Sequence, residues 1–148
     1  QLFDAVSMAL GIEERVDNGN ARNAYKALRA GGGTPRAQFN AAFGYDPSDP
    51  RDEVQGSIGQ ALVMMNSPII AAAINAEKPG TQLGRLLADL DNDEDVTVEL
   101  YLRCLAREPS DEELSTCLAY VAQLEDREEA FEDILWALVN STEFLHRQ

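Results

Sequence analysis

The chain has 148 residues, of which 45% are hydrophobic and 26% are charged, proportions typical of a folded soluble protein and not of a disordered tail. Its 26 acidic residues outnumber its 12 basic ones, and the net charge of −14 disfavours nucleic acid and anionic membranes as partners. Residues 75–148 hold 18 of the acidic and 6 of the basic side chains. That half suits a cation or a basic partner, although acid-rich helix surfaces also serve solubility alone.

The chain begins at Gln1 without an initiator methionine, directly on an amphipathic pattern, so we expect a fragment or a processed product. No basic region followed by an apolar stretch marks a targeting signal. The longest uncharged run, residues 54–76, is long enough to suggest a membrane span. Polar residues interrupt it, and Pro68 divides it into two halves of about ten residues each. The run therefore predicts two buried core helices and no transmembrane segment.

Helical periodicity dominates from the N-terminus onward. The first amphipathic stretch, residues 2–10, should end near Gly11, and a second covers residues 21–28 before the glycines at 31–33. Thr34 and Pro35 open a helix that Gly44 closes. Residues 46–50 contain two prolines and predict a loop, the best candidate for an internal boundary.

The second half continues the same pattern. Helices are predicted over residues 57–65 and 68–76, the latter opened by Ser67 and Pro68 and stopped by Pro79-Gly80. Thr81 caps the next helix, and residues 91–95 start another, with Val98, Tyr101 and Leu105 on one face and Leu100 and Cys104 alongside. Further helices follow a capping box at residues 110–113, a similar start at residues 126–129, and a last short turn at residues 143–145.

The predicted fold class is therefore all-α, a bundle of about eight helices. An N-terminal helical subdomain would precede a C-terminal unit of three successive antiparallel helices over residues 96–139, because short loops make neighbouring helices antiparallel. We expect a single domain over residues 1–148, with a subdivision into residues 1–45 and 54–148 as the alternative.

The acidic stretch at residues 91–95 resembles the start of a calcium loop. Asp91, Asp93 and Asp95 offer oxygen ligands at alternate positions, but Val96 and Leu102 stand where an EF-hand needs glycine and glutamate. Acidic residues are also expected in the first turn of a helix, near its positive dipole end. We favour the helix start, and we keep calcium as a weak alternative.

No familiar catalytic or cofactor motif is present in the sequence. His146 is the only histidine, so a two-histidine zinc site cannot be assembled from this chain. No Gly-x-Ser-x-Gly elbow and no Cys-x-x-Cys-His motif for covalent haem attachment occur. We therefore predict no catalytic residues and no cofactor, and we lean against an enzyme.

Cys104 and Cys117 fall on two consecutive helices, on faces that are predicted to meet. Their similar distances from the intervening turn allow a disulfide without implying one. Two buried free thiols are the alternative that we favour. Export of the chain would favour the bond.

Three segments, read in order, resemble a known family. They are Gln60-Ala61-Leu62-Val63-Met64-Met65-Asn66, then residues 100–113 with Arg107-Glu108-Pro109-Ser110, and then residues 136–145 with Trp136 and Asn140-Ser141-Thr142-Glu143-Phe144-Leu145. Together with Phe43-Gly44 they are similar to the C-terminal module of the planctomycete cytochrome-c-associated surface proteins, a domain of unknown function. The resemblance covers about residues 36–146. It departs at Glu108, where the family often has proline, and in the lack of cysteines over residues 46–58.

The resemblance implies an extracellular or periplasmic, envelope-associated setting and contact with other domains of the same protein or with a protein partner. It supplies no catalytic residue. It marks Asn66, Arg107, Trp136, Asn140 and Glu143 as signature residues that are either architectural or part of a partner surface.

The signature residues also suit structural roles, which we favour. Asn66 and Asn140 lie where helices must stop, and their side chains can bond the freed backbone. Arg107 lies at a helix C-terminus, from which it could pair with Glu143 or another acid. Trp136 is expected to pack between helices as a large anchor, with its indole N–H bonded to an acceptor.

We therefore expect a non-catalytic structural or protein-interaction module of a larger exported or envelope protein. One alternative is an accessory part of a redox or hydrolytic enzyme whose active centre lies in a missing N-terminal region. A second alternative is a calcium-stabilised module.

Overall fold

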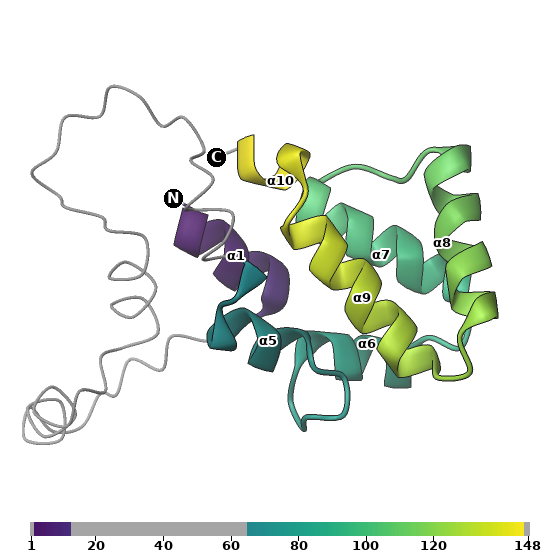
Figure 1. Cartoon of the computed structure of the whole chain (residues 1–148), viewed down its shortest axis with the longest axis horizontal. Coiled ribbons are helices and arrows are strands. Elements are labelled where there is room, and N and C mark those ends of the chain that lie inside the picture. The colour runs from purple at the N-terminus through teal and green to yellow at the C-terminus, as the bar shows by residue number, and fades with distance from the viewer. Residues whose placement is uncertain (1, 13–64, 147–148) are drawn as a thin grey trace, which may run out of the picture.

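The computed structural model describes residues 2–12 and 65–146, and within them the chain is all-helical, with seven helices and no strand (Figure 1). The all-α prediction is thus confirmed. The predicted helices over residues 21–28 and 35–43, the glycine run at 31–33 and the loop at 46–50 lie outside the described residues, and of the predicted helix over residues 57–65 only Met65 is described. The helices are α1 (Leu2–Leu10), α5 (Pro68–Ile74), α6 (Gln82–Asp89), α7 (Asp93–Leu105), α8 (Asp111–Gln123), α9 (Arg127–Val139) and α10 (Thr142–His146).

Helix α9 is the centre of the bundle. It contacts α5, α6, α7, α8 and α10. Its apolar residues recur with helical spacing and point into the core, which explains how one helix can serve so many neighbours. The buried residues of α9 are Ala130, Phe131, Ile134, Leu135, Leu138 and Val139.

Helices α7, α8 and α9 pack against one another pairwise, as expected for three helices joined by short loops. Figure 1 shows α8 at one edge of the bundle, standing steeply to α7 and α9. Helix α10 folds back onto α7 and α9 and buries Phe144. The C-terminal end of α7, the start of α8 and α10 consequently lie together.

The N-terminal helix belongs to the same core. Helix α1 contacts α5 and α7, and it buries Val6, Ala9 and Leu10 in the cluster to which α9 contributes Phe131. Gly11 ends α1 with a φ of +62°, as its position predicts, because glycine adopts this left-handed conformation without steric cost. Helix α1 is therefore part of the core that the later helices form.

Side-chain caps define most of the helix starts. Thr81, Asn92, Ser110 and Asp126 each accept a backbone N–H of the helix that follows. Ser110 and Glu113 form the reciprocal capping box that the sequence predicts. Local signals thus place α6, α7, α8 and α9 within a residue or two.

Three local expectations need correction. Helix α5 ends at Ile74, not at residue 76, because the Asn75 side chain accepts the N–H of Lys78 and forms a turn before Pro79-Gly80. Ser67 precedes Pro68 as predicted, but its side chain makes no cap hydrogen bond.

On α7 the predicted residues Leu100, Tyr101, Cys104 and Leu105 are buried, but Val98 is only half-buried. Thr97 takes part in the buried face because its hydroxyl is satisfied by donating to the Asp93 carbonyl at 2.7 Å. The buried residues of α7 are Val96, Thr97, Leu100, Tyr101, Cys104 and Leu105.

Gly84 permits the close approach of α6 to the turn after α5. A Cβ at this position would lie 2.5 Å from the Ala76 carbonyl oxygen, which is backbone and cannot swing away. Gly84→Ala should therefore destabilise the protein by about 1 kcal/mol, since the clash outweighs the usual gain in helix propensity. Chemical denaturation measures this change, and an unfolding free energy that rises instead would show that the turn yields.

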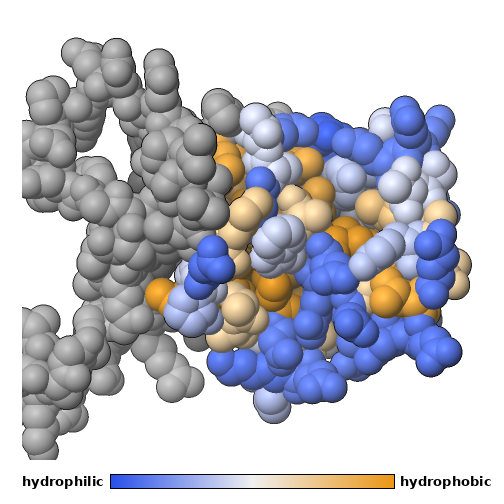
Figure 2. Space-filling model, in the orientation of Figure 1, coloured by the Kyte–Doolittle hydropathy of each residue, from blue (hydrophilic) through white to orange (hydrophobic). Residues whose placement is uncertain are grey.

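The surface is a mosaic. Figure 2 shows hydrophobic side chains visible between hydrophilic ones on one face of the bundle. The large hydrophobic side chains with the greatest exposure include Met8, Met65, Leu102, Tyr120 and Trp136. None of the helices in the described parts of the chain has the length and apolar character needed to cross a bilayer.

Candidate functional site

The signature residues Arg107 and Glu143 meet at the junction of three helices. Ala106 ends α7 in a left-handed conformation, with a φ of 51°, and turns the chain sharply at the residue before Arg107. A short loop then leads to the capping box of α8, which contains Glu113, while Glu143 lies in the first turn of α10. We call Arg107, Glu113 and Glu143 the arginine junction.

The guanidinium of Arg107 forms two forks. Its Nε and Nη2 donate to the two carboxylate oxygens of Glu143 at 2.9 and 2.8 Å, and its Nη1 and Nη2 donate to the two oxygens of Glu113 at 2.8 Å each. Nη1 also donates to the Glu108 carbonyl at 3.1 Å. An arginine has five N–H donors, and these are five bonds. The pairing with Glu143 that the sequence predicts is confirmed, and Glu113 completes it.

The junction is partly open to solvent. The side chains of Arg107, Glu113 and Glu143 are 33%, 34% and 39% exposed. The hydrogen bonds to Glu113 and then to Glu143 raise the pKa of Arg107 above its ordinary value. The guanidinium carbon also lies 5.5 Å from the ring centre of Tyr101, whose pKa rises to about 12, mainly through burial. The junction therefore places the Arg107 guanidinium and its carboxylate partners beside the Tyr101 ring at the edge of the core.

Glu113 should make the stability depend on pH. Hydrogen bonds from Arg107 and from the Ser110 N–H lower its pKa from 4.5 to about 2. As the pH falls, the unfolded chain takes up the proton first, so the stabilisation is complete above pH 4.5 and is lost on the way to pH 2. The melting temperature of Glu113→Gln should lie below that of the wild type at pH 7, and the two should converge in this acidic window.

Glu112→Gln is the matched control, since it removes the same charge from an exposed neighbouring position in α8. The melting temperature of Glu112→Gln should stay close to that of the wild type over the same pH range, because isolated surface charges contribute little to stability. A gap between Glu113→Gln and the wild type that does not narrow on acidification would contradict the role of the carboxylate.

A second arginine anchor escaped the sequence analysis. Arg127, the first residue of α9, donates from Nε to Asp93 at 2.8 Å and from its other nitrogens to the Leu87 and Leu90 carbonyls. It also lies over the Phe131 ring at 5.5 Å. A signal did exist, because a cation at the positive N-terminal end of a helix is unfavourable without a tertiary partner.

Glu132 is the other residue that sequence reasoning missed. Its carboxylate accepts the backbone N–H of Ala76 at 2.6 Å and ties the turn after α5 to the middle of α9. A lone glutamate within a helix carries no local signal for such a contact.

The remaining signature residues are dispersed. Asn140 ends α9, and its amide donates to the Trp136 carbonyl at 2.8 Å, which is the backbone role that was predicted. Asn66 lies in the turn before α5. The expectation that Trp136 packs between helices is wrong, because its side chain is 37% exposed. Its position falls outside the buried stripe of α9.

The acidic stretch is occupied by helix initiation and an ion pair. Asn92 caps α7, and Asp93 binds Arg127, while Asp91 and Asp95 are exposed. Within residues 2–12 and 65–146, no three acidic, thiol or imidazole side chains are placed to share a metal ion. The side chain of His146 lies outside the described residues.

Cys104 and Cys117 are both free thiols. Burial raises the pKa of Cys104 to about 12 and also raises that of the half-buried Cys117. Neither is therefore an activated nucleophile, because the reactive form is the thiolate. The Cys117 thiol is one of the groups that raise the pKa of Tyr101.

The comparisons with known proteins add no further assignment. No family model, no curated protein and no solved structure matches the chain, so the arginine junction has to be interpreted from its own geometry.

Proposed function

We propose that the chain is a non-catalytic helical module of a larger exported or envelope protein, and that it acts by packing against other domains or by binding a protein partner. The observation that carries the proposal is the saturation of Arg107. All five of its N–H donors are used by Glu108, Glu113 and Glu143. A substrate could therefore bind the Arg107 guanidinium through hydrogen bonds only by displacing one of these partners.

The chemistry of the neighbouring groups supports the same conclusion. Glu113 has its pKa lowered to about 2, so it is a poor general base or acid near neutral pH. The thiols of Cys104 and Cys117 have raised pKa values. A group that is to transfer protons or attack a substrate normally has its pKa shifted toward the working pH, and these are shifted away from it.

The exported or envelope setting comes from the resemblance of the three signature segments to the planctomycete surface proteins. The roles of Arg107, Asn140 and Glu143 as structural residues fit a module whose shape is its contribution. The strongly negative charge favours a cationic partner over nucleic acid or anionic lipid.

Turnover measurements test the non-catalytic proposal. Wild type and Glu143→Gln are assayed with nitrophenyl esters, phosphates and glycosides and with reduced and oxidised electron-transfer dyes, and their melting temperatures are recorded alongside. We expect no turnover above buffer for either protein, and a lower melting temperature for the variant. Turnover that disappears in Glu143→Gln while the fold persists would overturn the proposal.

A further inference from the structure

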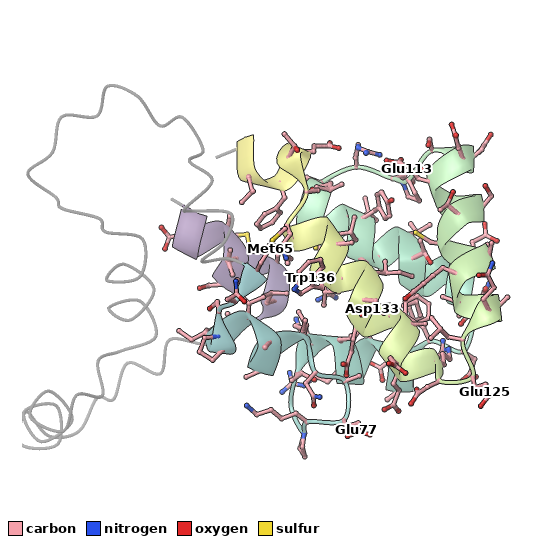
Figure 3. The ribbon with its side chains drawn as sticks, viewed as in Figure 1. Met65, Glu77, Glu113, Glu125, Asp133 and Trp136 are labelled. Atoms are coloured by element: carbon pink, nitrogen blue, oxygen red, sulfur yellow. The ribbon has the colours of Figure 1, made fainter. Side chains whose placement is uncertain are left out.

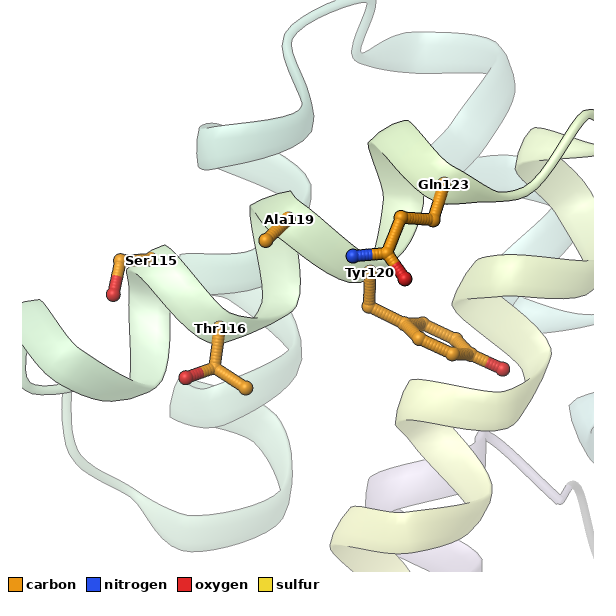
Figure 4. A pocket seen from close by; sticks show the side chains of 5 residues that line it. All are labelled: Ser115, Thr116, Ala119, Tyr120 and Gln123. Atoms are coloured by element: carbon orange, nitrogen blue, oxygen red, sulfur yellow. The ribbon is translucent and has the colours of Figure 1, made fainter.

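The outer face of α8 carries a shallow depression. It has a volume of about 410 Å³ and is lined by side chains from one side of the helix (Figure 4). Helix α8 buries only Val121 fully, so most of its surface is open to solvent. The lining residues are Ser115, Thr116, Ala119, Tyr120 and Gln123.

Two exposed aromatic residues extend this face onto α9. The Tyr120 ring reaches from α8 toward α9, and its hydroxyl donates to the Asp133 carboxylate at 2.6 Å. Trp136 follows Asp133 by three residues and so shares its face of α9, where Figure 3 shows both (labelled). The side chains of Tyr120 and Trp136 are each 37% exposed. Aromatic side chains of this kind are the usual anchors of protein interfaces.

The charge around these aromatic residues has one sign. Residues 111–139 contain nine carboxylates and a single basic residue, Arg127. The Arg127 guanidinium is engaged by Asp93 and by the Leu87 and Leu90 carbonyls. The hydrogen bond to Asp133 and the negative charges of Asp133 and Glu129 raise the pKa of the Tyr120 phenol. The exposed rings are thus flanked by negative charge without a neighbouring cation from α8 or α9.

We propose that Tyr120, Glu129, Asp133 and Trp136, together with the depression on α8, form a docking surface for a lysine- and arginine-rich helical segment of a partner protein. We call these residues the acidic aromatic surface. Its carboxylates attract and pair with the cations, while the rings pack against the alkyl parts of lysine and arginine and interact with their charges. This inference rests on the proposed protein-binding function and names the partner chemistry.

The negative charge of the acidic aromatic surface favours a basic partner segment over a second copy of the chain. A second copy of the chain would bring the same carboxylates onto one another, and like charges facing each other cost several kcal/mol. A basic segment removes that repulsion and covers both aromatic rings. We therefore assign the surface to a cationic partner and not to self-association.

Tryptophan fluorescence gives a direct test, because Trp136 is the only tryptophan of the chain. The probe is an 18-residue amphipathic helical peptide of lysine and leucine, added to the full chain in buffer with physiological salt. Binding should move the Trp136 emission to shorter wavelength and protect it from iodide quenching. The same peptide with glutamate in place of lysine should produce neither effect. A lysine peptide that leaves the emission and the quenching unchanged would overturn the assignment.

Paired variants separate the surface from general attraction to an acidic protein. Glu129→Gln with Asp133→Asn should weaken peptide binding at least about fivefold, because two carboxylates adjacent to the rings are lost. Glu77→Gln with Glu108→Gln removes the same charge from two exposed positions outside α8 and α9 and should weaken binding less than about twofold. Asparagine at position 133 keeps an acceptor for Tyr120, so the contact between α8 and α9 remains.

Three further results would reject the surface as the docking site. They are equal losses in the two double variants, equal binding of the glutamate peptide, and concentration-dependent dimerisation that protects Trp136 without any peptide. These three results have no bearing on the non-catalytic proposal, which is tested by the turnover measurements with Glu143→Gln. Peptide binding with the stated order of affinities, in turn, supports the surface whatever those assays yield.

Discussion

Phe131→Ala should lower the unfolding free energy by about 3–5 kcal/mol, the usual loss when a large aromatic side chain is removed from a core. The ring is fully buried in α9, the helix that contacts five others, so the cavity would open at the point where the bundle is held together. Arg127 also lies over this ring at 5.5 Å and would lose its aromatic partner. Equilibrium denaturation by urea, followed by circular dichroism, measures the change.

Trp136→Ala is the matched control for this experiment, because it removes an even larger ring from the same helix. With 37% of its side chain exposed, Trp136 should contribute only about 1–2 kcal/mol. A loss at Trp136 that equals the loss at Phe131 would show that the indole is buried after all, and it would count against the acidic aromatic surface.

The sequence predicts those parts of the fold that depend on local chemistry. Ser110 and Glu113 form their capping box within one turn, and the stripe from Phe131 to Val139 requires only the 3.6-residue period. The same period places Trp136 outside the buried stripe. The large size of Trp136 suggested that it is buried, but its position on the helix leaves it partly exposed.

The long-range contacts could not be read from the pattern. Glu132 reaches the Ala76 N–H across 56 residues, and Arg127 reaches Leu87 across 40, so both contacts exist only once the helices have docked. The pair of Arg107 with Glu143 was accessible as a hypothesis because each residue lies at a helix end, where its charge is favoured. The additional bonds from Arg107 to Glu113 depend on the turn at Ala106, and no local sequence signal predicts the left-handed φ of that residue.

Arg107→Gln should lower the melting temperature by about 5–10 °C, because it removes both charged forks at once and leaves Glu113 and Glu143 facing each other. Arg107→Lys should recover only part of the loss, since an ammonium keeps the charge but cannot form two forks. Glu143→Gln alone should cost less than Arg107→Gln, because one fork survives. The melting temperature of the double variant with Arg107→Gln and Glu143→Gln should fall by clearly less than the sum of the two single losses, as expected for residues of one network.

Arg103 provides the control from the same helix. It lies one turn before Arg107, its side chain is 34% exposed, and it forms a 2.7 Å ion pair with Glu99 within α7. Such a pair between adjacent turns contributes little, so Arg103→Gln should lower the melting temperature by about 2 °C or less. The two arginines have nearly equal exposure and differ in what they join, since Arg107 connects three helices. Equal effects of the two substitutions would therefore mean that the junction does not hold α7, α8 and α10 together.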